Sequence, residues 1–417
     1  MSSISKIAIL TGASLAWNPR AIKEATTLAH AGFDVIVYGS GTDRNRLEVD
    51  QALARRNGFA FESVESSLKI NLVHELCSMW RRICARVGRE TFKFLRIESH
   101  WQFGPAIARL CRQANAANAD YYIAHLEQGA WVGAKLMRQG RRVGIDMEDW
   151  YSEDLPPQAR KSRPIVSLRA LERQLLQQGA HSTCPSDAMS VALAREYACN
   201  PPAVIYNVFP WSDRTLIDGL SKDKSDSRIL SIHWYSQTIG PGRGLEDLLA
   251  ALPRLEHRAE IHLRGNPVSG FAEWFADHVP ETWRSYVFVH DLVPNEELLS
   301  RIAEHDIGFA GEMKYCKSRD LTITNKILHY LLAGLAVVAS DTAGQQEVAV
   351  KARGAVFLYP SGDPMALSHR LNALLESKER LQLAKTAALQ AAEQTFCWER
   401  QESALLGTVR RALGSIS

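Results

Sequence analysis

Residues 320–341 read DLTITNKILHYLLAGLAVVASD, and this stretch decides the fold. Its first half repeats apolar residues at three- and four-residue steps, which predicts a helix, and the Gly and the run LAVVA that follow predict a tight turn and a buried strand. Thr324 is the predicted N-cap. Asn325 and Lys326 then fall in the first turn, where free amides and the helix dipole favour an anion such as phosphate. The alternative is an ordinary βαβ helix with a surface lysine.

The same stretch resembles the family-4-like glycosyltransferases. These enzymes have the GT-B architecture, in which two Rossmann-like, doubly wound α/β domains face each other across a cleft. In many of them, an NK-containing helix followed by Y-small-small-G-x-x-V-V-A-S-D binds the sugar nucleotide. The residues in these places here are Asn325, Lys326, Tyr330, Gly334, Val337, Val338 and Asp341.

Two positions depart from the family pattern, which has one Glu before this helix and a second Glu within it. Leu321 and His329 occupy these positions. The resemblance implies that the second position contacts the nucleotide ribose, so we expect His329 to bind the ribose by hydrogen bonding. Glu312 and Asp320 are nearby candidates for the missing first carboxylate.

The length and composition indicate a globular protein of more than one domain. A chain of 417 residues predicts about two or three domains. The net charge of +3 is too small to argue for a nucleic-acid partner. No apolar run of about 18 residues and no signal-peptide pattern is present, so we expect a cytoplasmic protein. The seven cysteines lack a CxxC pair, which favours buried or idle thiols over disulfides or a zinc site.

The order of predicted elements gives two α/β domains. Residues 1–208 open with strand, loop, helix and strand, the start of a doubly wound parallel sheet. Residues 209–228 are polar and aperiodic, as expected of a linker. Residues 229–395 repeat the α/β pattern and form the predicted nucleotide-sugar domain. The resemblance implies that residues 396–417 form a helix that crosses back to the N-terminal domain.

The loop TGASLAWNPR follows the first strand, at the carboxyl end where ligands bind in open α/β sheets. The resemblance implies that this loop faces the acceptor or the donor phosphates, which singles out Gly12, Ala13 and Arg20. The alternative is structural: Pro19 starts a helix, and Arg20 pairs with Glu24 one turn later.

Two later strand ends carry polar side chains. His125 ends the strand DYYIAHL, and the resemblance implies that it hydrogen-bonds a hydroxyl of the donor sugar; otherwise it caps the next helix. After the strand RVGID, related enzymes read D-x-H-E where this chain has Asp146, Met147, Glu148 and Asp149. Glu148 and Asp149 could position or deprotonate an acceptor hydroxyl. Although DxED superficially resembles the metal-binding DxD of the other glycosyltransferase fold, we expect no metal, because GT-B enzymes generally need none.

The second domain begins with a strand, the glycine loop GPGRG and a helix. Glycines such as Gly242 let the backbone approach a phosphate. Arg243 matches the family's cation on the nucleotide diphosphate, while Gln237 replaces a companion Arg. We therefore expect Lys326 to supply the second charge, which stabilises the leaving diphosphate. The alternative for Arg243 is a surface cation in a turn.

The resemblance also implies a pocket for the base around residues 290–293, which is expected to include Asn266. The predicted donor-binding residues are Gly12, Ala13, Arg20, Gln237, Gly242, Arg243, Asn266, Leu292, Val293, Thr324, Asn325, Lys326 and His329. The predicted catalytic residues are His125, Glu148, Asp149, Arg243 and Lys326.

A basic amphipathic insertion spans about residues 67–104, where Lys and Arg alternate with aromatic and aliphatic residues. Such a segment can lie in a membrane interface, where each well-placed cation contributes about 1 kcal/mol on anionic lipid. The alternatives are a solvated helix that covers the first sheet, or an oligomer contact.

The leading hypothesis is a glycosyltransferase that moves a sugar from a nucleotide-sugar donor to an acceptor hydroxyl in glycan, glycolipid or polysaccharide biosynthesis. Family precedent implies retention of configuration without a metal or cofactor. The acceptor is a glycan, a lipid-linked sugar or a small molecule, and lipid binding would bring the protein to the inner face of the cell membrane. Two alternatives remain: a nucleotide-sugar 2-epimerase, or a non-catalytic GT-B scaffold, suggested by Leu321 and His329.

Overall fold

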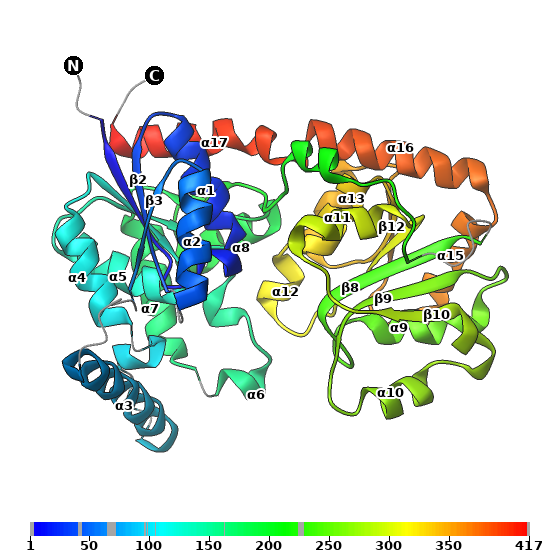
Figure 1. The fold of residues 1–417 in the computed structure, drawn as a ribbon, viewed down its shortest axis with the longest axis horizontal. Coiled ribbons are helices and arrows are strands. Elements are labelled where there is room, and N and C mark those ends of the chain that lie inside the picture. Colours follow the sequence, from blue (N-terminus) through cyan, green and yellow to red (C-terminus); the bar gives the residue numbers. More distant parts are fainter. Residues whose placement is uncertain are drawn as a thin grey trace. The chain divides into compact units, whose positions relative to one another are not determined.

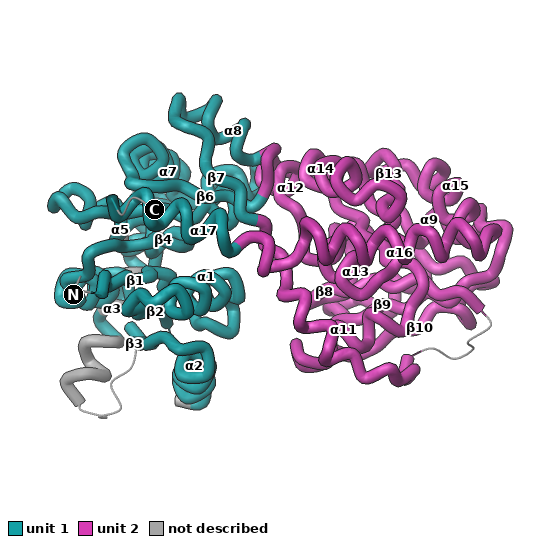
Figure 2. The backbone as a smooth tube through the Cα atoms, turned by 90° about the horizontal axis from the view of Figure 1, so that it is seen from above, with its two compact units in different colours: residues 1–185, 189–205, 402–417 teal, residues 186–188, 206–401 magenta. Residues whose placement is uncertain are grey.

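The structure is a computed structural model that describes residues 4–40, 44–64, 72–95, 97, 99–104, 106–161, 163–223 and 229–414. The chain forms two compact units (Figure 2). Unit 1 contains Met1–Pro185, Met189–Ile205 and Glu402–Ser417, and unit 2 contains Ser186–Ala188 and Tyr206–Gln401. Each unit is built on one parallel sheet with helices packed against it, which confirms the predicted pair of Rossmann-like halves (Figure 1).

Unit 1 has a seven-stranded sheet in the order β3-β2-β1-β4-β5-β6-β7, with parallel pairing throughout. The chain order reverses between β1 and β4, and the carboxyl ends of strands at such a point form a ligand-binding crevice. The strands are β1 (Lys6–Leu10), β2 (Asp34–Gly39), β3 (Ala60–Ser63), β4 (Tyr121–His125), β5 (Val143–Asp146), β6 (Ser182–Cys184) and β7 (Ala203–Val204).

The helices of unit 1 bury apolar stripes against this sheet. In α1, Ala21, Ala25 and Leu28 are fully buried, and Asn18 caps the helix by accepting a hydrogen bond from the Ala21 amide. The helices are α1 (Pro19–His30), α2 (Arg44–Arg56), α3 (Leu72–Leu95), α4 (Ile107–Ala117), α5 (Leu126–Arg138), α6 (Pro157–Arg160), α7 (Ile165–Gln178) and α8 (Asp187–Tyr197).

Unit 2 has a six-stranded parallel sheet in the order β10-β9-β8-β11-β12-β13, which reverses between β8 and β11. The strands are β8 (Ser231–Ile239), β9 (Glu260–Pro267), β10 (Val287–His290), β11 (Ile307–Ala310), β12 (Ala336–Ser340) and β13 (Val356–Tyr359). The helices are α9 (Leu245–Ala251), α10 (Phe271–His278), α11 (Asn295–Ala303), α12 (Lys317–Leu321), α13 (Asn325–Ala333), α14 (Ala343–Lys351), α15 (Pro364–Leu375) and α16 (Lys378–Gln394).

The stretch that decides the fold has the predicted structure. Helix α13 ends at Gly334, whose φ of +81° is the left-handed C-cap conformation that glycine adopts readily, and strand β12 follows with all its residues buried. Thr324 occupies the N-cap position, but its side chain makes no capping hydrogen bond.

The last helix, α17 (Trp398–Leu413), returns the chain to unit 1, as predicted, because residues from Glu402 onward cluster with that unit. Arg142 donates a hydrogen bond to the Leu413 carbonyl, and Thr27 donates to Glu402. None of the helices in the described ranges combines the length and apolar character needed to cross a bilayer.

The stretch predicted as a linker, residues 209–228, is packed within unit 2 where it is described. It contains a 3-10 helix, Trp211–Leu216, and Arg214 donates to the Leu332 carbonyl. Arg301 binds Asp218 at 2.5 Å. The loss of hydrophobic periodicity in this stretch therefore indicates an irregular but packed segment. Residues 224–228 lie outside the described part of the chain.

Candidate active site

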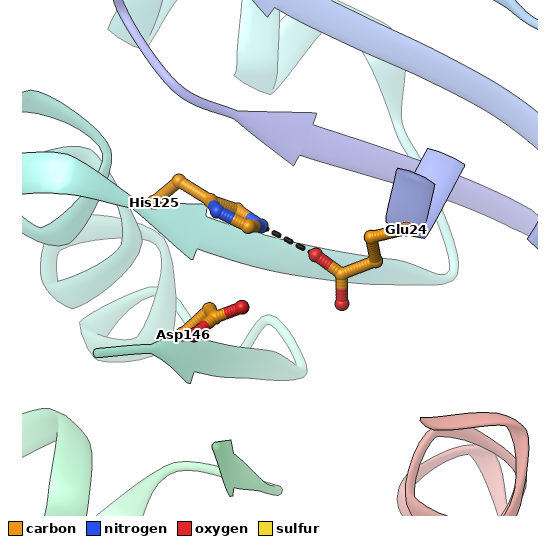
Figure 3. Close-up of side chains that lie close together, drawn as sticks. All are labelled: Glu24, His125 and Asp146. Atoms are coloured by element: carbon orange, nitrogen blue, oxygen red, sulfur yellow. Dashed lines mark hydrogen bonds and ion pairs between the residues drawn. The ribbon is translucent and has the colours of Figure 1, made fainter. Parts of the chain in front are cut away.

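A buried polar cluster lies at the carboxyl ends of β4 and β5 in unit 1 (Figure 3). His125, the last residue of β4, is fully buried. Its Nε2 lies 2.5 Å from Oε2 of Glu24 on α1, and its Nδ1 lies 2.8 Å from Oε1 of Glu148. Burial alone would lower the pKa of His125, but the charge of Glu24 and the hydrogen bonds to both carboxylates raise it well above 6.5. His125 is therefore an imidazolium that donates to two carboxylates.

Arg20 and Asp146 form the second ion pair of this cluster. The Arg20 Nε donates to Asp146 Oδ2 at 2.6 Å, and its Nη1 donates to the Ile205 carbonyl at 2.7 Å. Both side chains are almost completely buried. The alternative prediction, that Arg20 pairs with Glu24 one turn later, is wrong, because the guanidinium pairs with Asp146. Arg20 is also a buried anchor here, not an exposed group facing a phosphate.

Glu148 is the carboxylate of the cluster that solvent reaches. Its side chain is 17% exposed, compared with 2% for Glu24 and 3% for Asp146. Glu148 Oε1 also accepts a hydrogen bond of 2.9 Å from Asn18 Nδ2. The neighbouring Asp149 is half-buried. Of the predicted catalytic residues, Glu148 and His125 are thus in direct contact.

Backbone geometry next to this cluster is unusual. Leu126, directly after His125, has a φ of +58°, which a non-glycine residue adopts at a cost of about 1–2 kcal/mol. Its amide donates to the Tyr151 hydroxyl at 3.1 Å. His125 occupies the N-cap position of α5, as its structural alternative predicted, but its side chain makes no capping hydrogen bond. Strained residues of this kind cluster at functional sites.

Gly12 and Ala13 shape the loop after β1. Gly12 has a φ of +66°, and a Cβ there would lie 2.5 Å from Gln128 Oε1. Its amide donates to the Tyr38 carbonyl at 3.3 Å, and the Ala13 carbonyl accepts from the Ser40 amide at 3.0 Å. These backbone groups hold the loop on the sheet.

Glu24, His125 and Asp146 could also hold a metal, since their ligand atoms lie within 4.8 Å of one another. The observed hydrogen bonds of this cluster are better explained by protons on His125 than by a bound metal ion. Both nitrogens of His125 already bind carboxylates, and a guanidinium already binds Asp146. A metal would have to displace a proton from the imidazole and compete with Arg20.

In unit 2, Lys326 lies in the first turn of α13 and is paired with Glu312. Its Nζ is 2.6 Å from Glu312 Oε1, and both side chains are 14% exposed. The ammonium also lies 5.7 Å from the ring centroid of Trp234. Asp320, the other candidate carboxylate, instead accepts a hydrogen bond from the amide of Ala343, the first residue of α14.

Arg243 lies in the glycine loop before α9 and is exposed. Its Nη2 donates to Thr238 Oγ1 at 3.1 Å. The next residue, Gly244, packs so closely that a Cβ there would lie 2.5 Å from the Gly311 carbonyl oxygen and 3.1 Å from the Glu312 amide. The loop of Arg243 and the partner of Lys326 therefore adjoin each other.

His329 lies in an aromatic setting on α13. Its ring stacks on Phe209 with centroids 3.6 Å apart, and its Nδ1 is hydrogen-bonded to the Tyr235 hydroxyl at 2.5 Å. The remaining predicted donor residues lie at or beyond strand ends of the same sheet: Gln237, Gly242, Asn266, Leu292 and Asn325 are exposed, and Val293 and Thr324 are half-buried.

Residues 234–377 match the model of the family Glycosyl transferases group 1. The sucrose-phosphate synthase of Thermosynechococcus elongatus is similar over 99% of this chain and 100% of its own, with a TM-score of 0.71 and 14% identity. HepE of Anabaena, in complex with UDP-glucose, is similar over 97% of this chain and 99% of its own, with a TM-score of 0.67 and 15% identity. This chain has the GT-B glycosyltransferase fold.

The predicted resemblance to GT-B glycosyltransferases is thereby confirmed. A putative UDP-N-acetylglucosamine 2-epimerase of Listeria monocytogenes is similar over 100% of this chain and 98% of its own, with a lower TM-score of 0.57 and 12% identity. No curated protein matches this chain by sequence. The family match supports glycosyl transfer as the general activity of this GT-B chain.

Three residues of the two polar clusters described above are not predicted from the sequence as site residues: Glu24, Asn18 and Tyr235. Glu24 lies one turn after Arg20 on the partly buried edge of α1, and that position was interpreted only as an ion-pair partner. A charged residue on the buried face of a helix indicates that a partner of opposite charge is buried next to it. Asn18 has the local signal of an N-cap before Pro19, but its contact with Glu148 and the contact of Tyr235 with His329 join residues distant in sequence.

Proposed function

We propose that this chain is a glycosyltransferase that moves a sugar from a nucleotide-sugar donor to an acceptor hydroxyl, with retention of configuration and without a metal. The carrying observation is the cation arrangement of unit 2. Lys326 is fixed by Glu312 at the start of α13, and Arg243 lies in the glycine loop that packs against the same segment. Both residues lie within the part of the chain that matches the glycosyltransferase family.

Unit 2 binds the donor in this proposal. The α13 amino terminus, Lys326 and Arg243 hold the diphosphate, and their positive charge stabilises the negative charge that develops as the sugar–phosphate bond breaks. Likeness to HepE, which is described with UDP-glucose, supports a UDP-sugar as the donor. His329 and its partner Tyr235 then contact the ribose, and residues 290–293 with Asn266 form the pocket for the base.

The test measures UDP release from UDP-glucose and UDP binding by calorimetry. Lys326→Ala and Arg243→Ala should each lower turnover about ten- to a thousandfold, since each removes one charge-stabilising group. Arg258→Ala is the matched control, because Arg258 lies over the rings of Trp283 and Tyr286 in the same unit. Full activity in both site variants would refute the proposal. Loss of turnover on EDTA treatment would refute metal independence, and an epimerised free sugar formed without acceptor would favour the epimerase.

We also propose that α3 brings the protein to an anionic membrane surface, where a lipid-linked acceptor would lie. Trp80, Ile83 and Val87 are exposed on one face of α3, and Phe94 near its end is 74% exposed. The sequence around them is rich in Lys and Arg, which favours an anionic lipid surface. Residues 67–71, 96 and 98 of the predicted basic insertion lie outside the described ranges.

Co-sedimentation with phosphatidylcholine vesicles, with and without phosphatidylserine, tests this contact. The double variant Trp80→Ser/Phe94→Ser should reduce binding to anionic vesicles at least tenfold, because each buried aromatic side chain contributes about 1.5–3 kcal/mol. Leu383→Ser, at an exposed position of α16, is the control. Failure to bind vesicles combined with a dimer in light scattering would instead support an oligomer contact.

A further inference from the structure

His125 is held between two carboxylates that come from different elements of unit 1. Glu24 on α1 binds its Nε2, and Glu148, beyond β5, binds its Nδ1. A neutral imidazole has only one N–H, so only the imidazolium can donate both of these hydrogen bonds. The two carboxylates are therefore joined through one buried cation.

The cluster holds more negative than positive groups. The groups near His125 are the carboxylates Glu24, Glu148 and Asp146 and the guanidinium of Arg20. The imidazole of His181 is also near, but burial lowers its pKa to about 4, so it is neutral at pH 7. Arg20 balances Asp146, and His125 balances one of the two remaining carboxylates. The surplus negative charge lies on Glu148, because it is the carboxylate that solvent reaches.

The two oxygens of Glu148 have different surroundings. Oε1 accepts hydrogen bonds from His125 at 2.8 Å and from Asn18 at 2.9 Å. For Oε2, the described residues provide no hydrogen bond. Glu148 is thus fixed through one oxygen, and its second oxygen can accept a hydrogen bond from a ligand.

We propose that Glu24 is a positioning residue that acts through His125 to orient Glu148 as the proton acceptor for the incoming hydroxyl. This inference rests on the proposed glycosyl transfer. The acceptor O–H bond breaks and its proton passes to Glu148 Oε2, while the acceptor oxygen forms its bond to the anomeric carbon. The sugar–phosphate bond breaks and its electron pair leaves with the diphosphate. Glu24 itself touches neither substrate.

The Glu24 carboxylate lies in the interior of unit 1, where a substrate cannot reach it. Its side chain is 2% exposed, and its Oε1 is buried without a hydrogen-bond partner in the described structure. An ionised carboxylate in such a place is unfavourable unless a cation compensates it, and His125 is that cation. Removing the charge of Glu24 should let His125 lose its proton near neutral pH. Glu148 would then lose the positive charge beside Oε1, because a neutral ring keeps only one N–H.

The test compares Glu24→Gln, Glu24→Asp and the control Glu172→Gln in the full chain. Glu172 is a buried carboxylate of the same unit that binds Ser152 and Tyr197 instead. Glu24→Gln should lower kcat about ten- to a hundredfold at unchanged donor KM and move the alkaline limb of the kcat–pH profile toward neutral pH. Glu24→Asp should retain the wild-type profile. In ¹⁵N spectra, His125 should stay doubly protonated between pH 6 and 8 in the wild type and titrate in Glu24→Gln.

Several outcomes would overturn the inference. One is a wild-type kcat and pH profile in Glu24→Gln; another is a neutral His125 in the wild type. Stoichiometric Zn²⁺ or Mn²⁺ binding that Glu24→Gln abolishes would instead make the cluster a metal site. A kcat loss in Glu172→Gln as large as in Glu24→Gln would show that the loss comes from impaired folding. Failure of the wild type to bind UDP would refute the proposed function, whereas the histidine spectra would still test the charge state of His125.

Discussion

Two buried histidine sites, one in each unit, differ in charge. In unit 1, His125 is charged and lies between carboxylates. In unit 2, His233, His262, His290 and His305 pack ring against ring, with centroids of neighbouring pairs 4.5–5.2 Å apart. Burial lowers the pKa of His233 well below 6.5 and that of His262 to about 4. Burial is complete for both His125 and His233, so the number of carboxylate partners, not burial, decides the charge of the ring.

The topology of each unit explains its pattern. His233 and His262 are register partners on β8 and β9, His290 ends β10, and His305 shortly precedes β11, so the rings meet across adjacent strands. Arg264, close by, binds Asp223 and takes up negative charge that could otherwise favour protonation of these rings. In unit 1, by contrast, the ends of β4 and β5 and helix α1 bring acids to a single histidine.

The largest expected effect comes from breaking the charged cluster at its buried ion pair. Arg20→Met leaves Asp146 buried without its cation, and removal of one partner of a buried pair costs about 3–5 kcal/mol. The measurement is the free energy of unfolding in urea. The double variant Arg20→Met/Asp146→Leu should recover most of the loss, because no charge then remains uncompensated. A single variant within about 0.5 kcal/mol of the wild type would show that the pair adds little to stability.

The sequence predicts contacts between neighbouring residues better than contacts between residues far apart in the chain. The α13–β12 stretch was predicted from apolar spacing and one glycine, and Lys326 was located by its position in the first turn. The pairing of Arg20 was wrong because a local partner, Glu24, was available four residues away. The actual partner, Asp146, lies 126 residues later and reaches Arg20 only when β5 joins the sheet.

The irregular segments also contain contacts that the sequence pattern does not predict. Residues 209–228 show no periodicity, yet Phe209 stacks on His329, and Asp218 binds the buried Arg301. Packing of this kind depends on single side chains that meet over long sequence separations, and such contacts leave no repeat in the sequence. The histidine stack was missed for this reason, since its members are spread over residues 233–305.

The smaller effect is a pH dependence of stability with opposite signs for His262 in unit 2 and His125 in unit 1. His262 has a lowered pKa, so the folded state binds fewer protons than the unfolded chain between the unfolded value of about 6.5 and the folded value of about 4. Its contribution is fully present above pH 6.5 and is lost as the pH falls toward 4. At about 1.4 kcal/mol per unit of pKa, this loss is on the order of 3 kcal/mol. His125, with its raised pKa, stabilises unit 1 fully below pH 6.5 and loses this contribution as the pH rises through its folded value.

The free energy of unfolding measured between pH 4 and 8 separates the two contributions. His262→Phe keeps a ring that can stack on Phe288 and His290 but removes the titrating group, so it should flatten the loss of stability on the acid side. The alkaline side should stay as in the wild type, because His125 is untouched. An unchanged acid slope in His262→Phe would mean that this histidine is not the source. The acid sensitivity would then have to come from other buried histidines whose pKa burial lowers, such as His233 and His181.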